Sequence, residues 1–130
     1  MAKASILVVD DEPCVLQIVA RVLEGAGYEV AAASGPKEAL EMLSTRGSFE
    51  LVVSDVVMPE MCGPQLASEI RLRSPSSRIL FMSGWVPLEQ LPSGFPFLGK
   101  PFSSRDLLSA VEKAVQAPAS VPQESRGVGD

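Results

Sequence analysis

The sequence predicts an α/β fold, a three-layer α/β/α sandwich built around a parallel sheet. Short apolar runs, several of them rich in β-branched residues, indicate buried strands, and stretches with helical spacing of apolar residues separate them. Strands that alternate with helices pair in parallel, and right-handed crossovers cover both faces of the sheet. The five strand-like runs lie at residues 6–9, 28–33, 51–53, 79–82 and 95–98.

The length and composition are typical of a single globular domain. The 130 residues are 46% hydrophobic and 21% charged, which is enough apolar material for one core. A net charge of −5 and the lack of a basic cluster argue against nucleic-acid binding. The sequence contains neither an apolar run of roughly 18 residues nor a signal peptide. We therefore expect a cytoplasmic domain that makes no membrane contact.

The chain opens with a strand over residues 6–9, which ends at an acidic run, 10–12. Pro13 suits the first turn of the helix that follows, and glycines within 25–27 end that helix. A weaker strand is predicted over 28–33. The inner face of the helix is predicted from its i, i+3, i+4 spacing and consists of Val15, Ile18, Val19, Val22 and Leu23.

A second helix follows the weaker strand, with Ser34 as its predicted N-cap and Pro36 in its first turn. The next strand, 51–53, is apolar at every position, which indicates burial on both faces and a central place in the sheet. It leads to Asp55, and a loop marked by Pro59 then opens a third helix. The inner faces of these two helices are predicted to consist of Ala39, Leu40 and Leu43 in the second and Leu66, Ala67 and Ile70 in the third.

The last part of the chain continues the alternation. A strand over 79–82 ends at Ser83, and the prolines and glycine of 86–94 leave room for at most one helical turn. The fourth helix is therefore predicted to be shortened. Residues 95–98 follow as an edge strand, where proline is tolerated.

The final helix is predicted to begin at a capping box formed by Ser103 and Asp106. Residues 117–130 are rich in Ala, Pro, Ser and Gly, so we expect a flexible tail or linker there and a domain that spans residues 1–116. The inner face of the final helix is predicted to consist of Leu107, Ala110, Val111, Ala114 and Val115.

Polar side chains collect at one edge of the predicted sheet. The carboxyl ends of parallel strands meet at the same edge, which is where open α/β sheets bind ligands. Unit charges about 4 Å apart repel by roughly 4 kcal/mol at an effective dielectric near 20, so carboxylates gathered there are either protonated or share a cation. The residues expected at this edge are Asp10, Asp11, Asp55, Ser83 and Lys100.

The ligands available at this edge favour Mg²⁺, because all of them are oxygens and the chain has no His. Cys14 and Cys62 lack metal-ligand spacing, and we expect two reduced, partly buried thiols. A carboxylate, a hydroxyl and a lysine beside Mg²⁺ suit phosphoryl transfer. Asp55 is then the nucleophile, Mg²⁺ and Lys100 share the charge on the phosphoryl oxygens, and Ser83 donates a hydrogen bond.

Four motifs in order make the chain resemble the receiver domain of two-component signalling. They are the apolar and acidic run 6–12, the segment 55–59 with Gly63, the hydroxyl of Ser83 after the fourth strand, and Lys100-Pro101-Phe102. Together they span nearly the whole chain outside residues 117–130. The segments 79–85 and 96–102 are most similar to receivers attached to hybrid histidine kinases.

The resemblance implies a flavodoxin-like, five-stranded sheet with strand order 2-1-3-4-5. It implies that Asp55 accepts a phosphoryl group from the phosphohistidine of a histidine kinase or a histidine phosphotransfer protein. It also implies Mg²⁺ bound by Asp11, Asp55 and the backbone carbonyl of Val57, with Asp10 acting through water. Such a domain catalyses its own phosphorylation and turns over no external substrate.

The resemblance further implies a switch and a cis peptide bond between Lys100 and Pro101. Ser83 would move toward the phosphate while Phe97, at the position of the family's switch aromatic, turns inward and changes the contacts made with an unknown output protein. Packing alone is the other interpretation of Phe97.

Two other functions are compatible with the same residues. The interval between Ser83 and Lys100 is shorter than is usual in the receiver family. This suggests a receiver-fold adaptor whose partner binding does not depend on phosphorylation. A Mg²⁺-dependent phosphatase is less well supported, because nothing in the sequence supplies a second general acid or a substrate cap. For Asp10 and Asp11 taken alone, an acidic pair at a helix N-terminus is the simpler interpretation.

Overall fold

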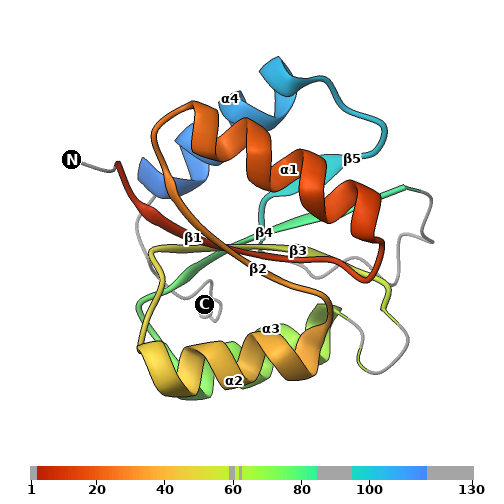
Figure 1. Ribbon diagram of the computed structural model, residues 1–130. Coiled ribbons are helices and arrows are strands. Elements are labelled where there is room, and N and C mark those ends of the chain that lie inside the picture. The colour runs from red at the N-terminus through yellow and green to blue at the C-terminus, as the bar shows by residue number, and fades with distance from the viewer. Residues whose placement is uncertain (1–2, 59–60, 62, 85–94, 117–130) are drawn as a thin grey trace, which may run out of the picture.

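The protein is described by a computed structural model that places residues 3–58, 61, 63–84 and 95–116. The described residues form five strands and four helices arranged as an α/β/α sandwich (Figure 1). In chain order these elements are β1 Ser5–Val9, α1 Pro13–Gly25, β2 Glu29–Ala33, α2 Pro36–Arg46, β3 Leu51–Asp55, α3 Gly63–Arg73, β4 Arg78–Ser83, β5 Phe97–Gly99 and α4 Ser104–Gln116.

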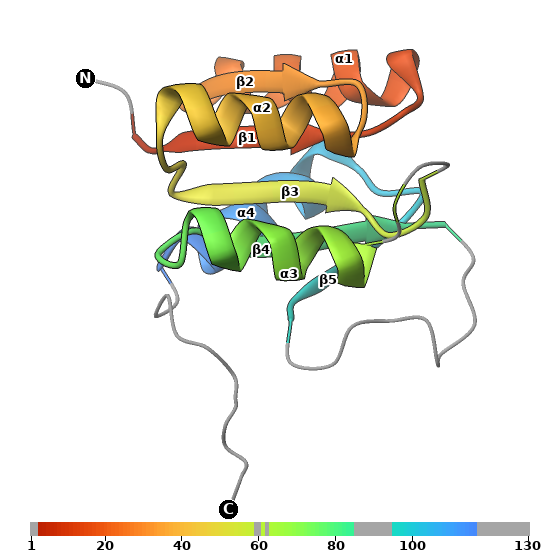
Figure 2. The same cartoon turned by 90° about the horizontal axis from the view of Figure 1, so that it is seen from below.

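The strands form one parallel sheet with the order β2-β1-β3-β4-β5, which confirms the predicted fold class and strand order. Helices α1 and α4 cover one face of the sheet, and α2 and α3 cover the other (Figures 1 and 2). β3 lies in the centre, paired with β1 on one side and β4 on the other. The carboxylate at its end, Asp55, is thereby placed at the middle of one sheet edge.

Two apolar cores explain why the central strands are apolar at every position. Alternate residues of a strand face opposite sides of the sheet. Leu7 and Val52 belong to the core under α2 and α3, whereas Ile6 and Val53 belong to the core under α1 and α4. All four side chains are fully buried. The strands at 6–9 and 51–53 are therefore apolar at every position because helices cover both faces of the sheet.

Helix α1 begins at Pro13 as predicted, but one residue of its predicted inner face is wrong. Ile18 is 60% exposed, whereas Val19 and Leu23 are buried. Successive residues of a helix are about 100° apart, so Ile18 lies about 100° around the helix from Val19 and outside the buried stripe. Leu16, which the spacing did not predict, is partly buried and packs against the core under α1 and α4.

Helix α2 begins differently from the prediction. Gly35, not Ser34, is the N-cap, because Pro36 occupies the first helical position. Ser34 instead donates its backbone N–H (2.8 Å) and its hydroxyl (2.9 Å) to the carboxylate of Glu38. These hydrogen bonds hold the pKa of Glu38 below its ordinary value. The predicted inner face is confirmed for Ala39 and Leu43, which are buried, and Leu40, which is partly buried.

Strand β5 is the edge strand, as predicted, but it starts two residues later than expected. Phe95 packs its ring against that of Phe81 in an edge-to-face contact with the centroids 5.4 Å apart. The carbonyl of Pro96 accepts a hydrogen bond from the Phe81 N–H at 3.1 Å. Residues 95 and 96 therefore anchor the entry to the strand through packing and one hydrogen bond, and regular pairing begins at Phe97.

Helix α4 confirms the predicted capping box. The Asp106 N–H donates to the Ser103 hydroxyl at 3.0 Å, and the Ser103 N–H donates to the Asp106 carboxylate at 3.3 Å. Leu107, Val111 and Ala114 on the predicted inner face are buried. The other two predicted inner-face residues, Ala110 and Val115, are partly buried.

Replacing Ser103 by Ala is expected to lower the free energy of unfolding by about 1 kcal/mol, because one helix-terminal N–H loses its acceptor. Urea unfolding followed by circular dichroism measures this change. Ser109→Ala, in the exposed middle of the same helix, is the matched control and should cost nothing. An equal response of the two variants would contradict the capping assignment.

Some predictions concern residues outside the described part of the chain. These are the shortened fourth helix in 86–94, the tail 117–130 and the environment of Cys62. The predicted partial burial of Cys14 is wrong: its side chain is exposed, because it follows Pro13 in the first turn of α1. Among the described residues, no helix has both the length and the apolar character that crossing a bilayer requires.

Candidate functional site

The carboxyl ends of four strands converge at one edge of the sheet. Asp10 directly follows β1, and Asp55 is the last residue of β3. Ser83 is the last residue of β4, and its register partner Gly99 ends β5 and places Lys100 just beyond the edge. The parallel register thus gathers side chains that lie up to 90 positions apart in the sequence.

Three carboxylates form the centre of this site. One oxygen from each of Asp10, Asp11 and Asp55 lies within 4.8 Å of the others. Asp10 is fully buried and Asp55 is 8% exposed, whereas Asp11 faces solvent. At this separation and an effective dielectric near 20, each ionised pair repels by roughly 3 kcal/mol. The cluster therefore needs positive charge.

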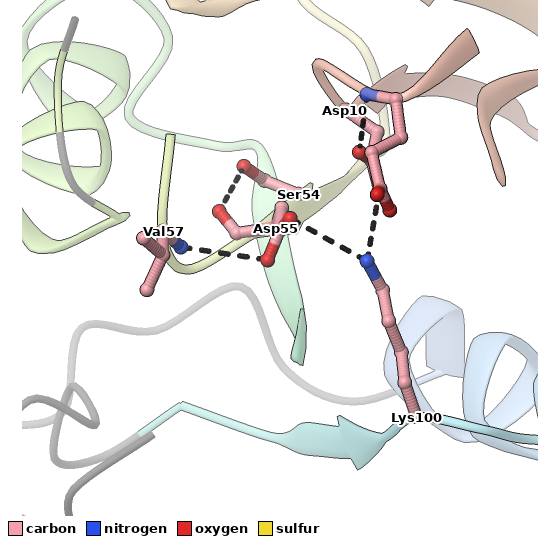
Figure 3. A network of polar contacts seen from close by, with 6 residues as sticks. Asp10, Ser54, Asp55, Val57 and Lys100 are labelled. Carbon is pink, nitrogen blue, oxygen red and sulfur yellow. Dashed lines mark hydrogen bonds and ion pairs between the residues drawn. The ribbon is translucent and has the colours of Figure 1, made fainter. Parts of the chain in front are cut away.

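Lys100 supplies part of that charge. Its ammonium lies 3.1 Å from Oδ2 of Asp10 and 3.4 Å from Oδ2 of Asp55, between the two strands (Figure 3). Its backbone N–H donates to the carbonyl of Ser83 at 2.7 Å, which fixes the start of the side chain next to β4. One ammonium among three carboxylates still leaves the site with an excess of negative charge.

The two buried carboxylates are held differently. Oδ1 of Asp10 accepts a hydrogen bond from the Glu12 N–H at 2.9 Å, while Oδ2 faces Lys100, so both oxygens have close partners. Within the described part of the chain, the hydrogen bonds of the Asp55 side chain are long: those to Lys100 and to the Val57 N–H both measure 3.4 Å. Asp55 is thus the carboxylate whose oxygens are less firmly engaged and more open to a new bond.

The pKa values of this pair follow from burial and charge. Burial raises the pKa of Asp55, the Lys100 ammonium opposes that rise, and the neighbouring Asp10 carboxylate adds to it. Burial alone would lower the pKa of Lys100. The carboxylates of Asp10 and Asp55 outweigh that effect and raise the pKa of Lys100 above its ordinary value. Lys100 is therefore protonated at neutral pH and remains a fixed positive charge in the site.

The other predicted site residues lie at different distances from this centre. Ser83 is buried at the end of β4, and the Lys100–Pro101 peptide bond is cis, as the resemblance implies. The Val57 side chain is 52% exposed beside Asp55. Phe97 pairs with Phe81, two residues before the Ser83–Gly99 pair at the sheet edge, and is 43% exposed.

The sequence interpretation missed Ser54. Its side chain is fully buried, and its hydroxyl donates to the carbonyl of Asp55 at 2.9 Å (Figure 3). The available signal was a polar residue directly between the apolar run 51–53 and the carboxylate.

The chain is similar to known signalling proteins. The family model for the response regulator receiver domain matches residues 6–112. The chain is 40% identical over 119 residues to the sensor kinase CckA of Brucella abortus, covering 87% of this chain and 13% of the kinase. It is 33% identical to the response regulator receiver protein CpdR of the same organism, covering 86% of this chain and 97% of that protein.

A solved structure agrees with these relatives. The crystal structure of the receiver domain from the hybrid histidine kinase CckA matches with a TM-score of 0.75 and 33% identity, covering 86% of this chain and 99% of that domain. The resemblance predicted from the sequence motifs is therefore confirmed: the chain belongs to the response regulator receiver domain family.

Proposed function

We propose that the domain accepts a phosphoryl group on Asp55 from the phosphohistidine of a histidine kinase or a histidine phosphotransfer protein. The observation that carries this proposal is the position of Asp55, at the end of the central strand, facing Lys100 and two further carboxylates. In the transfer an Asp55 oxygen forms a bond to phosphorus, and the bond from phosphorus to the histidine nitrogen breaks and leaves its electron pair on the imidazole. The product is an aspartyl phosphate.

Lys100 and Ser83 complete this chemistry. An ammonium 3.4 Å from Oδ2 of Asp55 is close enough to pair with a phosphoryl oxygen bonded to that carboxylate. The backbone carbonyl of Ser83 accepts a hydrogen bond from the Lys100 N–H, and the Ser83 hydroxyl can donate to a second phosphoryl oxygen. Both residues then stabilise charge that appears at Asp55 during the transfer.

The donor set fits Mg²⁺. Three carboxylates within 4.8 Å supply only oxygen ligands, and a single ammonium leaves their charge uncompensated. Asp11, Asp55 and the Val57 carbonyl would hold the ion, with Asp10 acting through water because both of its oxygens already have partners. When bound, Mg²⁺ neutralises negative charge on the phosphoryl oxygens.

Mg²⁺ is expected to raise the melting temperature of the protein, because an ion that binds only the folded state stabilises it. At a concentration of 100 times the dissociation constant the gain is about 2.7 kcal/mol. Asp11→Asn should remove most of this gain, since Asp11 is the exposed carboxylate of the cluster. Differential scanning fluorimetry with and without Mg²⁺ measures the shift, with the exposed Glu24→Gln as control. The same Mg²⁺ shift in Asp11→Asn and Glu24→Gln would rule out the site.

Phe97 is proposed as the switch aromatic. Its side chain is 43% exposed on the edge strand, which is consistent with the outward position of such a switch. Phosphorylation would draw the Ser83 hydroxyl toward Asp55 and let the ring turn inward, which changes the surface offered to an output protein. The relatives named as a sensor kinase and a response regulator support a place for this domain in a phosphorelay. We propose that the domain acts in the cytoplasm and turns over no external substrate.

The test of this function is the intact mass of the protein after incubation with acetyl phosphate, with and without Mg²⁺. We expect one phosphate-sized adduct that depends on Mg²⁺. No adduct, under conditions where the thermal shift demonstrates Mg²⁺ binding, would instead favour an adaptor whose contacts ignore phosphorylation.

A further inference from the structure

Ser54 is the polar residue in the interior of β3, and its surroundings are apolar. Alternation along the strand places it on the same face as Val52 and Val56, both buried in the core under α2 and α3. Burying a hydroxyl in such a place is unfavourable unless it forms a hydrogen bond. The Ser54 hydroxyl forms one with the carbonyl of Asp55 at 2.9 Å.

This hydrogen bond lies at the point where the pairing of β3 with β1 ends. The paired register of β1 and β3 ends at Val9 and Ser54, one residue before Asp55. On the other side, the Val56 N–H donates to the carbonyl of Met82 in β4 at 3.1 Å. The peptide group that joins Asp55 to Val56 is thus held at both ends, its carbonyl by Ser54 and its N–H by β4.

The orientation of this peptide group matters for the site. The two side-chain contacts that Asp55 makes with described residues are long, at 3.4 Å, so they fix its carboxylate only weakly. The position of the carboxylate must therefore depend more strongly on the backbone that carries it. The next residue, Val57, supplies the N–H to Oδ1 of Asp55 and the carbonyl assigned above to Mg²⁺. A rotation of the Asp55–Val56 peptide would displace all of these groups together.

We propose that Ser54 is a positioning residue for phosphoryl transfer: its buried hydroxyl fixes the peptide group after Asp55, and so sets the carboxylate and the Val57 backbone for the cation and the phosphoryl group. The proposal rests on the proposed function, in which Asp55 is the phosphoacceptor. Ser54 itself does not touch the phosphoryl group, because its side chain points into the apolar core.

Three replacements of Ser54 separate the hydrogen bond from the packing. Ser54→Cys keeps the approximate size but is a weak donor, Ser54→Ala removes the donor, and Ser54→Thr keeps the hydroxyl. The matched control is Ser77→Ala. Ser77 is another buried serine whose hydroxyl donates to a backbone carbonyl, that of Phe49, but it precedes β4 at the opposite edge of the sheet.

Two quantities are measured for each folded variant. The first is the rate of adduct formation at saturating acetyl phosphate and Mg²⁺, and the second is the Mg²⁺ dissociation constant by calorimetry without phosphodonor. We expect Ser54→Cys and Ser54→Ala to form the adduct about fivefold more slowly, roughly the effect of one hydrogen bond, and to bind Mg²⁺ more weakly. Ser54→Thr should stay near the parent, and Ser77→Ala should lose stability without either change.

The outcomes decide between the claims. A rate and a Mg²⁺ affinity for Ser54→Cys and Ser54→Ala within twofold of the parent would overturn the role of Ser54 and leave the proposed function intact. The same slowing in Ser77→Ala would also overturn it, because the effect would then follow stability. If the parent itself forms no adduct, the proposed function fails and takes the Ser54 proposal with it. Should Ser54→Thr not fold, the comparison with Ser77→Ala still decides.

Discussion

Asp55→Asn is expected to form no phosphoryl adduct with acetyl phosphate, under conditions that convert the parent. The amide has nearly the same shape as the carboxylate but is not a nucleophile, so the bond to phosphorus cannot form. Glu24→Gln, an acid-to-amide change on the exposed face of α1, should be phosphorylated like the parent. A Mg²⁺-dependent adduct of full intensity on Asp55→Asn would mean that another residue is the acceptor.

The same variant has a second expected effect, on stability. Burial raises the pKa of Asp55, which means that the fold disfavours its ionised form, and Asp10 and Asp11 repel it from within 4.8 Å. Replacing it by a neutral amide removes both penalties, at the loss of one long contact to Lys100. When both proteins are measured without Mg²⁺, the variant should therefore melt at a higher temperature than the parent, although it has lost the phosphorylation site. A misfolded variant would give the opposite result.

Lys100→Met is expected to reduce both stability and the rate of phosphorylation. Asp10 is fully buried, and Lys100 is the cation that pairs with it in the described part of the chain. Removing one partner of a buried ion pair leaves an uncompensated charge, so we expect the free energy of unfolding to fall by about 3 kcal/mol without Mg²⁺. The rate of adduct formation should fall about 100-fold, as it does when a charge-stabilising group is removed from an active site.

A double variant distinguishes the two effects of Lys100. Adding Asp10→Asn to Lys100→Met removes the unpaired buried charge, so stability should partly return while the rate of phosphorylation stays low. Lys113→Met, an exposed lysine on α4, is the control and should change neither quantity. Urea unfolding measures the stability of each variant, and adduct kinetics on folded protein measures the rate of phosphorylation. If Lys100→Met is phosphorylated as fast as the parent, the role assigned to Lys100 is contradicted.

Much of the fold was predictable because burial on both faces leaves a strong trace in the sequence. Residues 6–9 and 51–53 are apolar at every position, and this pattern predicts β1 and β3. The errors arose where local geometry decides. Ile18 lies only one residue from the buried stripe of α1, and the sequence spacing does not fix how the helix is rotated on the sheet. At α2, Pro36 displaces the cap from Ser34 to Gly35.

The composition of the site was predictable for a similar reason, since parallel strands deliver their last residues to one edge. This places Asp10, Asp55 and Lys100 together without knowledge of any side-chain conformation. What the sequence could not provide is the state of each group. The position of the Lys100 ammonium between two carboxylates, and the hydrogen bond from Ser54 to the backbone, depend on packing and rotamers that no spacing rule specifies.

The central claim is that phosphate forms on Asp55, and borohydride trapping tests it most directly. Reduction of an aspartyl phosphate converts that residue to homoserine, which peptide mass spectrometry locates in the sequence. After incubation with acetyl phosphate and Mg²⁺, we expect homoserine at position 55 alone, and none when Mg²⁺ or the phosphodonor is left out. Homoserine at position 10 or 11 instead, or an adduct that survives without any aspartate being reduced, would contradict the account.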